Sequence, residues 1–121
     1  MNTEHVTEAL YAGAMWMVER ERPLDAAHFF RAMLLHSPTD ERGWLGLGQC
    51  HEQLEQDAEA EELYIAATVA AERKVRCLVA LARLYRRNQA QDEADRVLDD
   101  ALDMAPNEDL ADLVTQERER Q

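Results

Sequence analysis

The sequence predicts an all-α protein built from three helix–turn–helix repeats and one further helix. The main evidence is a period of 34 residues, at which small and apolar residue types recur along most of the chain. Glycine and proline are scarce, with 4 and 3 among 121 residues, which favours helices over a turn-rich sheet protein. Apolar residues within each segment also follow the spacing of one helix face. At this length we expect a single domain that spans residues 1–121.

Four rows of residues define the period. Two rows hold small residues, and the other two hold larger apolar ones. In chain order the rows are Ala26, Ala60 and Ala94; Phe30, Tyr64 and Leu98; Leu10, Trp44 and Leu78; and Ala14, Gly48 and Ala82. One such row could arise by chance, but several rows in the same register are a specific signal of repeats.

Each repeat is expected to contain two helices joined by a short polar turn. The repeats fall at about residues 7–40, 41–74 and 75–106, with helices at 7–20, 23–36, 41–54, 57–70, 75–88 and 91–104, and a C-terminal capping helix at about 107–119. Pro23 suits the first turn of a helix, because the amide group at that position has no hydrogen-bond partner within the helix in any case. Asp40, Asp57 and Asn107 are the expected helix N-caps.

The small residues are expected to lie where the two helices of a repeat approach each other. Gly48 and Ala60 form this pair in the second repeat. A leucine at Gly48 would overpack the joint and cost about 1–3 kcal/mol or more. Alanine should be tolerated at Gly48 or stabilise the helix slightly, because the other two repeats carry alanine there.

Charge and composition exclude several classes of function. The net charge of −12 argues against nucleic acids and anionic membranes as partners. The N-terminus has neither a basic start nor an apolar run, and no segment is apolar enough to span a bilayer, so we expect a cytoplasmic protein without membrane insertion. Cys50 and Cys77 are expected to be buried, reduced thiols.

No catalytic constellation stands out in the sequence. It contains no glycine-rich phosphate loop and no nucleophile or zinc-protease motif. The four histidines are scattered, whereas a zinc site needs three or four clustered ligands. We therefore expect a protein that is not an enzyme, with no metal and no cofactor.

A binding surface is expected on the concave side of the stack, which the first helix of each repeat would line. Counting from residues 7, 41 and 75, the side chains at positions 2, 5, 9, 12 and 13 should face this groove. The candidate site residues are Tyr11, Met15, Val18, Leu45, Gln49, Val79, Arg76, Arg83, Arg86 and Arg87. An apolar end and a cationic end would suit an extended or helical peptide with apolar anchors and acidic groups. Alternatively, some of these side chains pack on a terminal helix or pair with surface carboxylates.

The order of residue types resembles the tetratricopeptide repeat, which implies a right-handed superhelix with a concave groove. Within that family, the run Leu45-Gly46-Leu47-Gly48-Gln49-Cys50 resembles the type III secretion chaperones of translocator proteins, the class II chaperones. These chaperones typically carry a Leu-Gly-Leu-Gly-x-Cys run. The resemblance implies a cytosolic protein that binds a segment of an apolar translocator in its groove and keeps that client soluble and unassembled before export, in a system associated with virulence.

Two features depart from that family and leave alternatives open. Met15 stands where an aromatic groove residue is common in the family. Only about six residues precede the first expected repeat, whereas family members usually have a longer N-terminal region that is often used for dimerisation, so a homodimer remains open. A chaperone of a needle subunit or another early export substrate, and a generic repeat scaffold in a cytoplasmic assembly, are the alternative functions.

Overall fold

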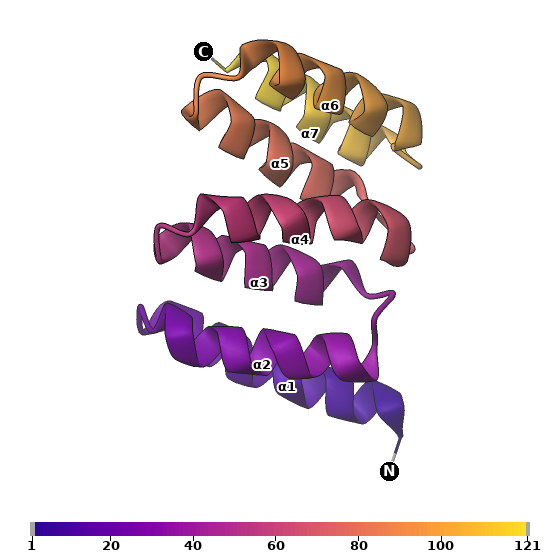
Figure 1. Ribbon diagram of the computed structural model, residues 1–121. Coiled ribbons are helices and arrows are strands. Elements are labelled where there is room, and N and C mark those ends of the chain that lie inside the picture. The colour runs from indigo at the N-terminus through magenta and orange to yellow at the C-terminus, as the bar shows by residue number, and fades with distance from the viewer. Residues whose placement is uncertain (1, 121) are drawn as a thin grey trace.

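The computed structural model describes residues 2–120, which form a single stack of α-helices in chain order (Figure 1). The helices are α1 (Thr3–Glu19), α2 (Pro23–His36), α3 (Glu41–Gln53), α4 (Asp57–Ala70), α5 (Val75–Arg87), α6 (Gln91–Met104) and α7 (Glu108–Glu119). The described residues contain no strand, and the predicted all-α fold is confirmed. Among these helices, none combines the length and the hydropathy that crossing a bilayer requires.

Three of the seven described helices, α1, α3 and α7, begin with a side-chain N-cap, and α2, α4, α5 and α6 have none. The side chain of Asp40 accepts a hydrogen bond from the Arg42 amide at 3.0 Å, and Asn107 caps α7 in the same way. The prediction that Asp57 caps α4 is wrong, because Asp57 is the first helical residue and its carboxylate instead accepts bonds from Arg87 and Asn88.

The first helix begins four residues earlier than expected. Asn2 precedes it in an extended conformation, and its side chain accepts a hydrogen bond from the Glu4 amide at 2.9 Å. This cap satisfies one of the amide groups that a helix N-terminus leaves without a partner. Helix α1 therefore extends about one turn beyond the repeat period at its N-terminal end.

Aromatic rings pack directly on the backbone of α3. A Cβ atom at Gly46 would lie 2.2 Å from the Phe30 ring of α2, and one at Gly48 would lie 2.3 Å from the Tyr64 ring of α4. Both rings are buried, with at most 2% of their surface exposed. The glycines are thus needed for space, because each receives a ring from a different neighbouring helix.

The expectation that alanine would be tolerated at Gly48 is therefore wrong. Its close neighbour is the Tyr64 ring, not the small side chain of Ala60. In the third repeat Ala82 and Leu98 take the places of Gly48 and Tyr64, and both are fully buried. The first repeat has Ala14 and Phe30 at these positions, and there the Phe30 ring lies against Gly46 of the next helix pair.

One carboxylate links the second repeat to the third. Glu41 begins α3 and is only 8% exposed, and its side chain accepts a hydrogen bond from the Cys77 amide at 3.0 Å. That amide lies in the first turn of α5, where the N-cap residue Lys74 offers no side-chain bond. Glu41 therefore caps a helix of the next repeat. Burial raises the pKa of Glu41, and the bond from Cys77 opposes that rise only in part.

Helix α7 presents a polar surface where a further helix would pack. Shifting the apolar core positions of α5 by one period of 34 residues gives Asp112, Thr115, Gln116 and Glu119, and all four are exposed. On its other side α7 places Leu110 and Val114 in the core of the third repeat. This is the arrangement of a capping helix at the end of a repeat stack.

We predict that Gly48→Ala will destabilise the protein by about 1–3 kcal/mol, because the new methyl group must displace a buried ring. Adding Tyr64→Leu recreates the Ala82 and Leu98 pair of the third repeat. The double variant should therefore lose less stability than the sum of the two single variants. Urea denaturation measures all three. Strict additivity would mean that Gly48 and Tyr64 do not pack on each other.

A second prediction concerns the pH dependence of stability. Because the pKa of Glu41 in the folded protein lies above its ordinary value of 4.5, the folded state binds this proton more tightly than the unfolded chain does. The stability contribution of Glu41 therefore falls as the pH rises from 4.5 through the folded-state pKa. Glu41→Gln keeps an acceptor for Cys77 and removes the titration, so it should gain stability relative to the parent as the pH rises from 4.5 to 8. A difference that is constant or that shrinks with pH would contradict this account.

Candidate peptide-binding groove

The candidate groove is lined by α1, α3, α5 and α7, and its side chains form rows spaced by 34 residues. The apolar row consists of Tyr11, Leu45, Val79 and Leu113, and the row beside it of Met15, Gln49, Arg83 and Glu117. Helix α7 thus contributes Leu113 and Glu117, two residues that the sequence analysis did not assign to the groove. Extending the 34-residue register beyond residue 106 would have identified both.

At its N-terminal end the groove is partly apolar and partly closed by an ion-pair network. Tyr11, Met15 and Val18 are half-buried and pack against the core of the first repeat. The Tyr11 ring lies 6.5 Å from that of Phe30, and the Arg42 guanidinium carbon lies 4.5 Å from the centre of the Tyr11 ring. These side chains give the groove an apolar surface, and their contacts with the core of the first repeat hold them in place.

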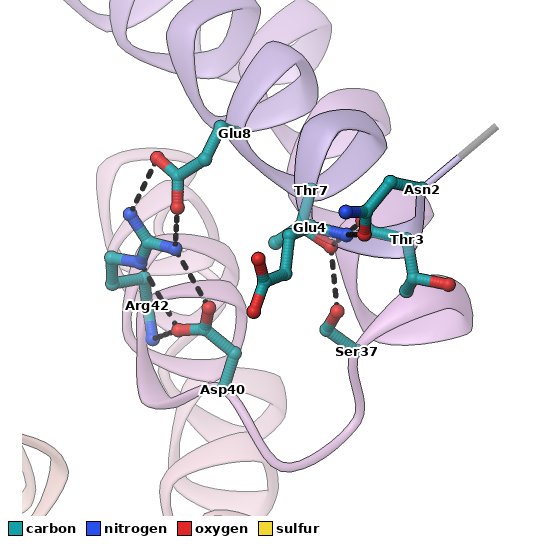
Figure 2. A network of polar contacts seen from close by, with 8 residues as sticks. All are labelled: Asn2, Thr3, Glu4, Thr7, Glu8, Ser37, Asp40 and Arg42. Atoms are coloured by element: carbon teal, nitrogen blue, oxygen red, sulfur yellow. Dashed lines mark hydrogen bonds and ion pairs between the residues drawn. The ribbon is translucent and has the colours of Figure 1, made fainter.

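Arg42 ties α1 to α3 across the groove. Its guanidinium bonds the Glu8 carboxylate of α1 at 2.7 Å and the Asp40 carboxylate at 2.8 Å (Figure 2). These hydrogen bonds hold the pKa of both carboxyls below their ordinary values. Figure 2 also shows a second polar contact. The hydroxyl of Thr7 on α1 shares a 2.6 Å hydrogen bond with the hydroxyl of Ser37, which directly follows α2.

A hollow lies in the middle of the groove, between α3, α5 and α7. It has a volume of about 140 Å³ and is lined by Leu45, Gln49, Arg76, Val79, Ala80, Arg83 and Leu113. We call it the central hollow. A larger and more polar hollow of about 520 Å³ adjoins it and shares Gln49, Ala80 and Arg83 with it. Leu45, Gln49, Arg76 and Arg83 thus line one hollow, and their role in binding stays a prediction.

Val79 differs from its predicted role as an exposed groove residue. It is only 3% exposed and belongs to the core of the third repeat, together with Leu110 and Val114 of α7. It therefore forms the floor of the central hollow. The cause is α7, which packs beside α5 and covers a side chain that would otherwise face the groove.

Most arginines of the expected cationic end pair with carboxylates of the fold, which is the alternative that the sequence left open. Arg83 and Arg86 both donate hydrogen bonds to the carboxylate of Glu117, a residue that is 2% exposed. Burial of Glu117 opposes its ionisation, but the bonds from the two arginines outweigh burial and lower its pKa. Arg87 pairs with Glu52 at 2.7 Å and with Asp57 at 2.8 Å. The groove arginines thus mainly hold neighbouring helices together.

Arg76 is the exception on this face. It is exposed at the first turn of α5 and forms no ion pair within 4.0 Å anywhere in residues 2–120. Its side chain lines the central hollow and also a second, polar hollow of about 410 Å³ around Ser37, Asp40, Glu41 and Arg42.

The cysteines are structural in character. Cys50 and Cys77 are both free and buried, as the sequence predicted. Burial raises the pKa of Cys50 to about 11 and also raises that of Cys77. Within the described part of the chain, no three His, Cys, Asp or Glu side chains are grouped in a way that would hold a metal ion.

Comparisons with known proteins agree with this architecture. A sequence model of the tetratricopeptide repeat matches residues 17–74. Among solved structures, the type III secretion translocator chaperone SycD of Yersinia enterocolitica superposes with a TM-score of 0.82 at 25% identity, over 93% of this chain and 84% of that chain. A second structure, SycD in complex with a peptide of the translocator YopD, gives a TM-score of 0.73 at 22% identity over 93% and 94% of the two chains.

The fold is not restricted to secretion chaperones. The first tetratricopeptide domain of human RPAP3 superposes with a TM-score of 0.74 at 14% identity, over 94% of this chain and 93% of that chain. No curated protein matches the sequence significantly. Residues 17–74 match the tetratricopeptide repeat in sequence, and the whole stack has the fold of tetratricopeptide-repeat structures. In structure it resembles the type III secretion translocator chaperones.

We predict that Glu117→Ala will loosen α7 from the stack. The substitution leaves the partly buried guanidinium of Arg86 and the more exposed one of Arg83 without their shared carboxylate, and it should cost about 1–3 kcal/mol. Hydrogen exchange should rise most in the amides of α7. Glu119→Ala, at an exposed position of the same helix, is the control and should change stability by no more than about 0.5 kcal/mol. Equal effects of the two variants would show that the ion pairs do not hold α7.

Proposed function

We propose that this protein is a cytoplasmic chaperone of type III secretion. It binds a segment of an apolar translocator in its groove and keeps that client soluble and unassembled until export. The observation that carries the proposal is the row of partly exposed apolar side chains on the groove face, with Leu45 at its centre. Grooves lined by apolar side chains with a few polar groups are the usual form of a binding site.

The position of Leu45 supports binding better than a purely structural role. Its neighbours along α3 already occupy the helix faces that pack inside the stack: Gly46 receives Phe30, Leu47 is 3% exposed in the core, and Gly48 receives Tyr64. Leu45 remains half-buried at the edge of the central hollow. Part of the Leu45 side chain packs against the core around Ala80 and Leu84, and the part that stays exposed gives an apolar client a contact.

The solved structures that resemble this chain also support a role as a chaperone. SycD is described as a translocator chaperone, and one of its structures contains a peptide of the translocator YopD. Because a human domain with the same fold matches almost as well in shape, the fold alone does not favour secretion over scaffolding. The groove face and the likeness to SycD together favour a chaperone without enzymatic activity, which acts by binding its client.

We predict that Leu45→Glu will abolish client binding while the melting temperature changes little. The new charge would lie in the central hollow, where an apolar client side chain would have to desolvate it. The test is co-expression with the translocator encoded nearest to this gene, followed by measurement of the soluble client. Val69→Glu is the matched control, because Val69 is 85% exposed on α4 and lines neither groove hollow.

The parent and the Val69 variant should keep the translocator soluble, and the Leu45 variant should not. A translocator that stays insoluble with the parent protein would contradict the proposed function. If a needle subunit encoded nearby is kept soluble instead, the client class is different and the groove proposal stands. If Leu45→Glu retains full binding, the client contacts another surface.

A further inference from the structure

Among the described residues, the groove carries one arginine that forms no ion pair. The other arginines on this face are each held by a carboxylate: Arg42 by Glu8, Arg83 and Arg86 by Glu117, and Arg87 by Glu52. Across residues 2–120, Arg76 alone among the groove arginines has no ion-pair partner, although the chain has 25 acidic residues and only 13 basic ones. In so acidic a protein, an exposed unpaired arginine beside an apolar hollow needs an explanation.

The charge of Arg76 acts on the nearby Glu41 without forming an ion pair with it, and the two nearby carboxylates on α3 and at its N-cap have other partners. Glu41 is already bonded to the Cys77 amide, and Asp40 is bonded to Arg42. Arg76 therefore borders the central hollow as a free donor, beside the apolar side chains of Leu45 and Leu113. A ligand placed in that hollow would have an apolar contact and a cation within one or two residues of each other.

On the basis of the proposed function, we propose that Arg76 makes the groove selective for client segments with an acidic side chain next to an apolar anchor. The apolar side chain enters the central hollow between Leu45 and Leu113, over the floor formed by Val79. The neighbouring Asp or Glu pairs with the guanidinium of Arg76. Arginine suits this role because its planar group can bind both oxygens of one carboxylate.

A single acidic side chain fits the charges better than a polyanion does. The protein has a net charge of −12, so a nucleic acid or an anionic membrane would be repelled over the rest of the surface. One carboxylate on an otherwise apolar segment meets only the local positive charge.

The first experiment selects ligands without assuming a client. A phage-displayed library of random 12-residue peptides is panned against the full-length protein and against Leu45→Glu, Arg76→Gln and Arg96→Gln. Arg96 is exposed on α6 and lines neither groove hollow, so its substitution matches the charge change of Arg76→Gln away from the groove. The parent and the Arg96 variant should enrich peptides that place Asp or Glu within two residues of a large apolar residue. The Arg76 variant should enrich apolar peptides without that acid.

The second experiment measures the pair directly. The best peptide is labelled with fluorescein and compared with its Asp→Asn or Glu→Gln form by fluorescence polarisation. Removing the acid should weaken binding to the parent and to Arg96→Gln by about threefold to tenfold, and this loss should shrink at high salt. The same change should have no effect on binding to Arg76→Gln.

The outcomes separate the two proposals. If the parent enriches no peptide over Leu45→Glu, the groove does not bind extended segments, and the proposed function fails together with this inference. If peptides depend on Leu45 but show no acid preference, or lose equal affinity on all variants when the acid is removed, the role of Arg76 is overturned and the proposed function stands.

Discussion

The architecture depends on two aromatic rings that pack against the bare backbone of α3. Phe30 reaches Gly46 from one side, and Tyr64 reaches Gly48 from the other. The first contact joins the first two repeats, and the second joins the two helices of the second repeat, each more closely than a side chain with a Cβ atom would allow. They also fix the rotation of α3 about its axis, because both faces that carry a glycine must point at a ring. The side of α3 that remains carries Leu45 and Gln49, so the packing of the core decides which residues line the groove.

Charged groups hold neighbouring repeats in register. Glu8 and Arg42 occupy the same position in successive repeats, and so do Arg83 and Glu117. The pair of Glu8 and Arg42 lies in solvent and should contribute little to stability. Glu117 is different, because its carboxylate is buried between two guanidinium groups and could not be left alone there. Most groove arginines therefore stabilise contacts between helices, whereas Arg76 forms no ion pair within the described residues.

The fold and most helix ends could be predicted because they depend on local and periodic features. Small residues at 34-residue spacing, Pro23 at a helix start and the Asp40 cap are all visible in the sequence. The site was harder to predict, because it depends on which helix covers which side chain. Val79 appeared free only because α7 was treated as a cap outside the period. The sequence also could not predict which side chain packs on Gly48. The spacing identifies a small residue there, but it does not tell whether a ring or a methyl group fills the space beside it.

The central claim is that a client segment lies across α3 and α5, over Leu45. Site-specific photo-cross-linking tests this most directly, with a photoreactive benzoyl-phenylalanine placed at Gln49 in one variant and at Val69 in another, both in the native host. Gln49 is exposed and borders both groove hollows, whereas Val69 is exposed on α4. The account predicts a cross-link to one apolar secreted protein from position 49 and none from position 69. A client that cross-links from position 69 and not from position 49 would contradict it.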